Sequence, residues 1–114
     1  MITGLDHVQV AAPAGCEESA RAFYGGILGL PEIPKPEAMQ ATGGVWFTCG
    51  TQELHIGVEK DFAPARKAHP GFMTDDIDAI VERLDSVEWD ERIPGTRRLY
   101  TADPFGNRLE IRES

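Results

Sequence analysis

The chain has 114 residues, of which 41% are hydrophobic and 26% charged, and its formal net charge is −8. This length suits one domain with a real core, and the composition is that of a globular protein. The negative charge argues against nucleic acid or an anionic membrane as the main partner, and no apolar run reaches the roughly 18–20 residues that span a bilayer.

The first residues and the two cysteines predict a cytoplasmic protein. Residues 1–4 lead straight into a strand-like segment, so we expect no signal peptide. Cys16 and Cys49 form no CxxC pair and lack the density of a disulfide scaffold. We therefore expect both to be reduced thiols that pack as small apolar side chains.

The first half of the chain predicts one helix and several strands. In order, these are a strand at 5–12, a helix at 16–28, a short or edge strand within 31–39, and a hairpin of 44–49 with 52–59. The helix carries apolar residues three and four positions apart, and Gly29 followed by Pro31 ends it.

The second half repeats this order after a charged connector at 60–67. We expect a strand at 68–73, a helix from 77 to 84, a short strand at 87–92, and a hairpin within 99–114. Asp76 is suited to cap the helix, and Pro104 with Gly106 is suited to the hairpin turn. In the last strand Glu110 points away from the face formed by its apolar neighbours.

Each half therefore has the order strand, helix, strand, strand, strand, which indicates an internal duplication of a βαβββ unit. We expect an α+β fold in which the two units pack side by side as one domain, with one curved mixed sheet and the helices on its outer face. The expected limits are 1–59 for the first unit, 60–67 for the connector and 68–114 for the second unit.

The three histidines and Glu110 occupy corresponding places in the two units. His7 and His69 are expected to open the first strands, whereas His55 and Glu110 lie in the last strands. The side-chain period of two puts them opposite the apolar faces, so they would converge on the concave face of the sheet. Three imidazoles and one carboxylate favour Zn, Ni, Co or Fe over Mg or Ca.

Four stretches also carry a family resemblance. They are Gly4–Val8, Ala22–Tyr24 with Leu28–Leu30, Asp75–Ala79 and Asp103–Glu110. The chain resembles the vicinal oxygen chelate superfamily, which includes glyoxalase I, extradiol dioxygenases, methylmalonyl-CoA epimerase and the fosfomycin and bleomycin resistance proteins. The resemblance implies a glyoxalase-like fold, a homodimer and metal ligands at His7, His55, His69 and Glu110, the set that the alternation and the repeat also indicate.

His55 departs from the family pattern, because glyoxalase I-like members usually have Glu and epimerase-like members Gln at that position. A proton-transfer role for His55 therefore does not follow from the resemblance, and Glu53, two residues away on the same strand face, is an alternative base. The catalytic candidates are His55, Glu53 and Glu110. The candidates for substrate contact are Gln9, Trp46, Met73, Tyr100 and Arg98.

Two classes of function follow. The first is a metal-dependent lyase or isomerase of the glyoxalase type, which chelates an oxygenated small molecule through two neighbouring oxygens. The second is a metal-free module that binds or sequesters a small molecule, as in bleomycin resistance. A dioxygenase is less favoured because known members are longer. A fosfomycin-type thiol transferase is less favoured because Gln9 replaces a usual Thr and no Arg follows Arg112.

Overall fold

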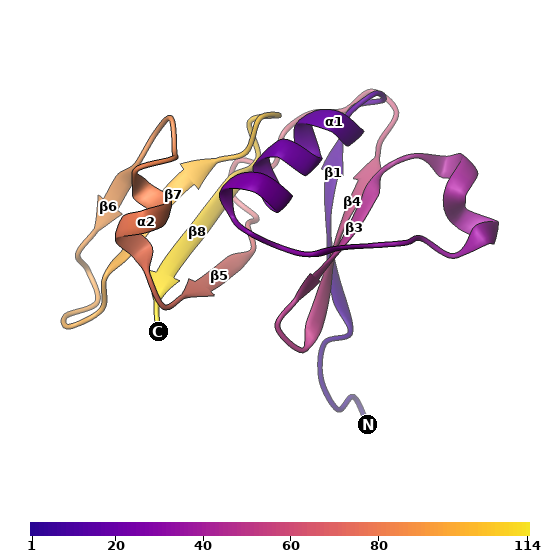
Figure 1. The fold of residues 1–114 in the computed structure, drawn as a ribbon. Coiled ribbons are helices and arrows are strands. Elements are labelled where there is room, and N and C mark those ends of the chain that lie inside the picture. Colours follow the sequence, from indigo (N-terminus) through magenta and orange to yellow (C-terminus); the bar gives the residue numbers. More distant parts are fainter. The chain divides into compact units, whose positions relative to one another are not determined.

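The computed structural model describes all residues from 1 to 114. The chain forms two compact units, Met1–Ala63 and Pro64–Ser114 (Figure 1). The boundary between them falls within the stretch 60–67 that the sequence suggested as the connector.

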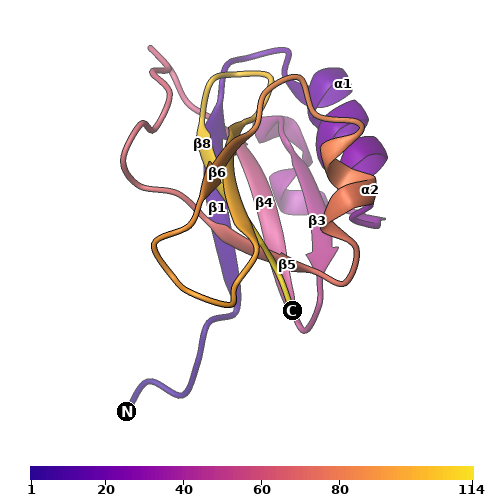
Figure 2. The same ribbon diagram turned by 90° about the vertical axis from the view of Figure 1, so that its left-hand side faces the viewer.

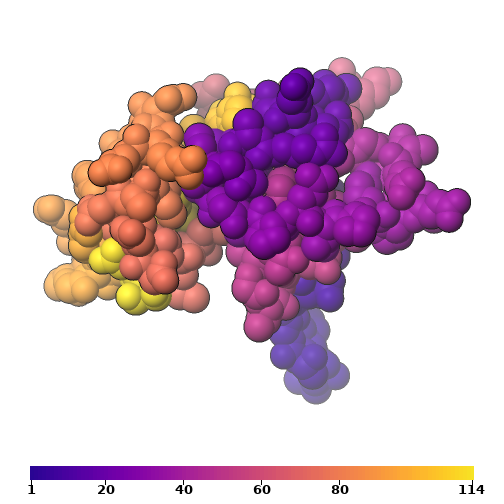
Figure 3. All heavy atoms as spheres, in the orientation of Figure 1, coloured from indigo at the N-terminus to yellow at the C-terminus, as the bar shows by residue number.

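Unit 1 is a four-stranded mixed sheet with helical segments. Its strands are β1 (His7–Ala12), β2 (Glu32–Ile33), β3 (Val45–Cys49) and β4 (Gln52–Val58), in the order β1-β4-β3-β2. β1 is parallel to β4, and the other pairs are antiparallel. The segment η2 (Glu37–Thr42), a 3₁₀-helix, stands out from the rest of this unit (Figures 1 and 3). The proline-rich segment thus provides only a two-residue edge strand, as expected.

The expected helix at 16–28 forms, but most of it is not α-helical. A short helix, α1 (Glu17–Ala20), continues as the π-helix η1 (Arg21–Ile27), which lies to one side of β3 and β4 in both ribbon views (Figures 1 and 2). A π-helix has more residues per turn, so neighbouring side chains come closer to one face. Phe23 and Tyr24 are accordingly both buried, and the Tyr24 ring lies 6.1 Å from that of Phe47.

Gly44, which precedes β3, contacts both α1 and β4. The Gly44 N–H donates to Glu17 Oε2 at 2.6 Å, and this bond lowers the pKa of Glu17. Gly44 has φ +89°, and a Cβ there would lie 2.1 Å from the backbone oxygen of Ile56 on β4. Only glycine fits this position.

Unit 2 repeats the same topology. Its elements are β5 (Gly71–Thr74), α2 (Ile77–Val81), β6 (Glu88–Asp90), β7 (Arg98–Ala102) and β8 (Arg108–Glu113), and the sheet order is β5-β8-β7-β6. Its first strand is again parallel to its last. The α+β glyoxalase-like architecture is therefore as predicted, with the strands hydrogen-bonded as two four-stranded sheets, one in each unit, where we had described one.

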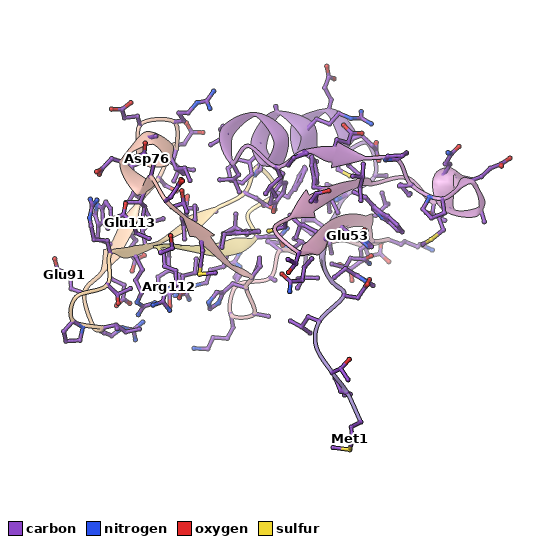
Figure 4. The ribbon with its side chains drawn as sticks, turned by 60° about the horizontal axis from the view of Figure 1, so that its bottom comes forward. Met1, Glu53, Asp76, Glu91, Arg112 and Glu113 are labelled. Atoms are coloured by element: carbon purple, nitrogen blue, oxygen red, sulfur yellow. The ribbon has the colours of Figure 1, made fainter.

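The start of α2 has the capping chemistry that the sequence predicts. Asp76, labelled in Figure 4, accepts the N–H of Ala79 at 3.1 Å through Oδ1. Glu113 at the end of β8 accepts the N–H of Ile77 at 3.1 Å. The helix ends at Val81, earlier than the expected 84, and a 3₁₀-type bond from the Leu84 N–H to Val81 follows. These bonds hold α2 at the end of β8.

The loop between β7 and β8 is built around one carboxylate. Asp103 Oδ1 accepts the N–H groups of Phe105 and Asn107, each at 2.9 Å, and Gly106 takes φ +89°. The Asn107 side chain is 1% exposed, and its Oδ1 accepts the N–H of Ala65 at 2.9 Å. The turn predicted from Pro104 and Gly106 is present, and it also anchors the first residues of unit 2.

The apolar faces of the strands lie in the core of each unit. In unit 1 Leu54 and Ile56 are buried, and in unit 2 Leu99, Leu109 and Ile111 are buried. The period of two therefore places His55 and Glu110 on the opposite faces, as expected. None of the helices combines the length and the apolar character that a membrane-spanning segment needs.

Candidate functional site

In unit 1 three rings from three strands form a stack. The Trp46 and His55 rings are 3.7 Å apart at an angle of 2°, and the His55 and His7 rings are 4.2 Å apart at 16°. The sheet register produces the stack, because Trp46 lies directly opposite His55 and His7 pairs with Glu53, two residues earlier on β4. His55 is buried between the two rings and is only 4% exposed.

Each histidine of the stack uses one ring nitrogen in a hydrogen bond. His55 Nε2 lies 2.9 Å from Glu53 Oε1, whose residue is on β4 (Figure 4). His7 Nδ1 lies 2.9 Å from Asp6 Oδ2. The two side chains differ in access, because the His7 side chain is 44% exposed and that of His55 is 5% exposed. His7 therefore presents its other nitrogen, Nε2, without an assigned partner.

The stack limits what His7 and His55 can do together. An imidazole binds a metal along a nitrogen lone pair, which lies in the plane of its ring. Two stacked rings inclined by 16° have planes that meet only beyond ~10 Å, whereas a metal–nitrogen bond is about 2.0–2.1 Å long. In this arrangement the two rings cannot hold the same ion.

Gln9 also belongs to this face of unit 1. It lies opposite His55 on β1, and its side chain crosses Gly57, where a Cβ would lie 2.7 Å from Gln9 Nε2. Of the predicted contact residues, Trp46 thus stacks on the buried imidazole of His55, whereas the Gln9 amide lies over Gly57, two residues further along β4.

In unit 2 His69 faces Glu110. His69 Nε2 and Glu110 Oε1 are 3.8 Å apart, too long for a hydrogen bond. The other nitrogen, Nδ1, lies 2.9 Å from the backbone oxygen of Lys67. His69 was expected to open a strand, but β5 begins two residues later at Gly71. The intervening Pro70 has no N–H for a strand ladder, although its oxygen accepts the N–H of Glu110.

Arg98 holds Glu110 from the other side. Its Nη1 donates to Glu110 Oε1 at 2.7 Å and to the Tyr100 hydroxyl at 3.2 Å, and its Nη2 lies 2.8 Å from Asp90 Oδ1. Arg98 is only 6% exposed, and its Nε has no hydrogen-bond partner. Asp90 on β6 lies directly opposite Arg98. Hydrogen bonds from Arg92 lower the pKa of Asp90 to about 2, and the positive charge of Arg98 contributes to this shift.

The residues of unit 2 that were predicted to contact substrate differ in how exposed they are and in which side chains they already contact. The Tyr100 ring meets the His69 ring edge-on at 5.4 Å, so Tyr100 adjoins the His69–Glu110 pair. Met73 on β5 is 74% exposed. Arg98 was expected to contact substrate, but in this structure its guanidinium is engaged by two carboxylates. Sequence reasoning missed Asp90, because its place opposite Arg98 depends on the register of β6 and β7, which the sequence does not specify.

A family model covers almost the whole chain. The model for the "Glyoxalase/Bleomycin resistance protein/Dioxygenase superfamily" matches residues 4–111. The chain belongs to this superfamily. No curated protein sequence matches it significantly.

Solved structures of the superfamily share the fold. A protein from Bacillus anthracis described as a glyoxalase family member is 52% identical, with a TM-score of 0.94, over 100% of this chain and 97% of that chain. The lactoylglutathione lyase from Agrobacterium tumefaciens is 25% identical, with a TM-score of 0.72, over 99% and 95%. The fosfomycin resistance protein FosX from Listeria monocytogenes is 20% identical, with a TM-score of 0.74, over 100% and 93%, and shows a common fold only.

The donor chemistry of two predicted ligands, His7 and His69, fits a divalent metal. No group of three or more His, Cys, Asp or Glu side chains is placed together for an ion in this structure. His7 and His69 both use Nδ1 in a hydrogen bond to an oxygen, which leaves the Nε2 lone pair for a metal, as is usual for ligating histidines. His55 does not fit in this arrangement, because Glu53 takes its Nε2 and it is stacked on both faces.

Proposed function

We propose that this protein is a metal-dependent enzyme of the glyoxalase type, a lyase or isomerase that acts on an oxygenated small molecule. The observation that carries the proposal is the orientation of His7 and His69 by hydrogen bonds at Nδ1. The similarity to a lactoylglutathione lyase supports this class of chemistry.

The proposed ligands are His7 and His69 through Nε2 and Glu110 through its carboxylate. Their nitrogen and oxygen donors suit Zn, Ni, Co or Fe. The spacing within unit 2 supports two of them, because ligands bonded to one ion at about 2.1 Å lie about 3.0–3.5 Å apart, close to the observed 3.8 Å. Arg98 keeps Glu110 oriented for this role through the hydrogen bond from its Nη1. When bound, the metal would polarise a substrate oxygen as a Lewis acid.

His55 and Glu53 are the proposed proton-transfer pair. The Glu53 carboxylate lies 2.9 Å from His55 Nε2, so the two can share a proton. Glu53 is 41% exposed and can meet a substrate, whereas His55 is buried behind it. In this role His55 acts through Glu53. The role expected from the sequence, in which His55 is a fourth metal ligand, would require the imidazole to turn out of the stack.

Metal analysis tests the proposal. We expect wild-type protein, purified without chelator or histidine tag, to bind about one first-row metal ion per chain at micromolar levels. His69→Ala and Glu110→Gln should lose more affinity than the roughly 10–100-fold that changes outside the ligand shell cost. His55→Ala is the matched control, because it removes an imidazole that we place outside the ligand set.

Three outcomes would contradict parts of this proposal. If wild type takes up no metal, the protein is instead a metal-free binding module of the bleomycin-resistance type. If His69→Ala or Glu110→Gln binds metal as tightly as wild type, the ligand set is wrong. If His55→Ala loses metal as the ligand variants do, His55 is the fourth ligand.

We also propose a cytoplasmic location, which is supported by the two thiols being free. A thiol-blocking assay on intact cells should find Cys16 and Cys49 reduced, and an oxidised pair would contradict it.

A further inference from the structure

A cavity of about 660 Å³ lies within unit 2 and has two arginines in its wall. Arg66 comes from the first residues of the unit and Arg108 from the start of β8. Tyr100 on β7 forms part of the wall, and Glu88 on β6 is the one carboxylate that borders the cavity. The wall thus carries two positive charges against one negative charge, in a chain whose net charge is −8.

The Arg108 guanidinium is placed so that it can bind an anion. Its guanidinium carbon lies 4.0 Å above the centre of the Tyr100 ring. A guanidinium over a ring face still has five N–H donors, which can form two parallel bonds to a carboxylate or phosphonate. No carboxylate in the structure pairs with Arg108, whereas Arg98 pairs with two and Arg97 also pairs with two.

The backbone beside both arginines is fixed. The Arg108 N–H donates to the Ala65 oxygen at 2.9 Å, and the Ala65 N–H donates to Asn107 Oδ1 at 2.9 Å. Arg66 directly follows Ala65, so the two arginines start from backbone segments that are bonded to each other. A preoriented donor loses less conformational entropy when it binds a ligand.

The cavity shares a residue with the His69–Glu110 pair. Tyr100 supports Arg108 on its ring face, meets the His69 ring edge-on at 5.4 Å, and accepts a hydrogen bond from Arg98 through its hydroxyl. An anion held at Arg108 would therefore lie one aromatic ring away from His69 and Glu110, two of the proposed metal ligands.

We propose that this cavity binds the anionic group of the substrate, a carboxylate or a phosphonate-like oxyanion, through Arg108 with Arg66 beside it. This inference rests on the proposed function and deepens it, because it specifies an oxygenated small acid as the substrate class. The apolar part of the wall, which includes Pro64 and Val87, suits a small hydrocarbon portion of that acid.

Anion titration of the full-length, chelator-treated protein tests the inference. The probes are propionate, methylphosphonate and the neutral propionamide, and the signal is the side-chain Nε–H resonance of Arg108 in ¹⁵N spectra. We expect at least one anion to bind saturably and propionamide not to bind. Arg108→Gln should weaken the binding about tenfold or more, because it removes a charged bidentate partner. For this variant, the Tyr100 ring and backbone resonances report the titration.

Arg112→Gln is the matched control. Arg112 lies on the same strand four residues later (Figure 4), carries the same charge, and does not border the cavity. We expect it to bind the anion within about twofold of wild type, since it alters only long-range charge. Arg108→Lys keeps the charge without the fork and should give an intermediate affinity, provided that its thermal unfolding matches wild type.

The outcomes decide the inference separately from the proposed function. Saturation by propionate alone identifies a carboxylate, and saturation by methylphosphonate alone identifies a phosphonate or phosphate; both support the site. No saturation by either anion up to about 100 mM, or an equal loss in Arg108→Gln and Arg112→Gln, would overturn it. Because the titration is done without metal, an anion site can survive a failure of metal binding, and metal binding can survive a failure of the anion site.

Discussion

Arg98 is a charged side chain that is almost fully buried, at 6% exposure. Burying a charge is costly unless it is paired, and Arg98 meets this condition by contacting Asp90 and Glu110, which are 11% and 16% exposed. The three residues come from three different strands of unit 2. Arg98 therefore has a structural task, to join β6, β7 and β8, and a positional one, to hold Glu110 toward His69.

Replacing Arg98 should unfold unit 2 more easily. We expect Arg98→Met to reduce the free energy of unfolding by about 2–4 kcal/mol, because the largely buried Glu110 carboxylate loses its arginine partner and Asp90 keeps only Arg92. Arg97→Met is the control, since its ion pair with Asp78 is exposed and should be worth less than about 1 kcal/mol. Urea unfolding measures both losses. Equal losses in the two variants would show that the buried pairs do not stabilise the unit.

The residue types of the site could be predicted from the sequence, but their partners could not. The strand period placed His55 and Glu110 on the faces opposite the core because that period is local. The stack of Trp46, His55 and His7 depends on the register of three strands, which the sequence does not specify. The same holds for Arg98, whose partners lie on neighbouring strands.

At the level of elements, the turns are more informative than the helices. The hairpin loop that begins at Asp103 was predictable because its residues supply their own hydrogen bonds and conformations. The π-helix η1 was not, because the pattern of apolar residues that predicts a helix does not distinguish i+4 from i+5 bonding. The strand β5 begins after His69 rather than before it, because Pro70 interrupts the ladder.

The contact between Gly44 and β4 can be tested with two alanine substitutions. Gly44 and Gly15 both have positive φ, at +89° and +81°, but only Gly44 is close to another backbone atom. We expect Gly15→Ala to lower the free energy of unfolding by about 1 kcal/mol, because alanine disfavours a positive φ. Gly44→Ala should lower it by several kcal/mol, because its Cβ would in addition lie 2.1 Å from the Ile56 oxygen. Urea unfolding followed by circular dichroism provides both values, and similar costs would contradict the close approach.

At the scale of the whole molecule, the duplication is the main feature. Both sheets place their first strand parallel to their last, and both have the same strand order. The sequence indicated this repeat through only two pairs of matching positions, because packing constrains the polarity pattern of each half more than its individual residues.

We expect the protein to be a homodimer. Each four-stranded sheet ends in edge strands, β1 and β2 in unit 1 and β5 and β6 in unit 2, and exposed edges favour pairing with another chain. Light scattering after size exclusion, over a range of protein concentrations, should give twice the mass of one chain. A monomer at the highest concentration would contradict the prediction.

The hydrogen bonds that orient the two candidate ligands His7 and His69 have a consequence for how such a protein can evolve. Each bond is made to a residue at most two positions away, Asp6 in one case and Lys67 in the other. A gene segment that encodes either half therefore encodes both a candidate metal ligand and the group that orients it. When one half is duplicated or diverges in sequence, the hydrogen bond that orients the histidine of the other half is unchanged. Ancestral halves could change substrate independently without rebuilding the geometry of each histidine.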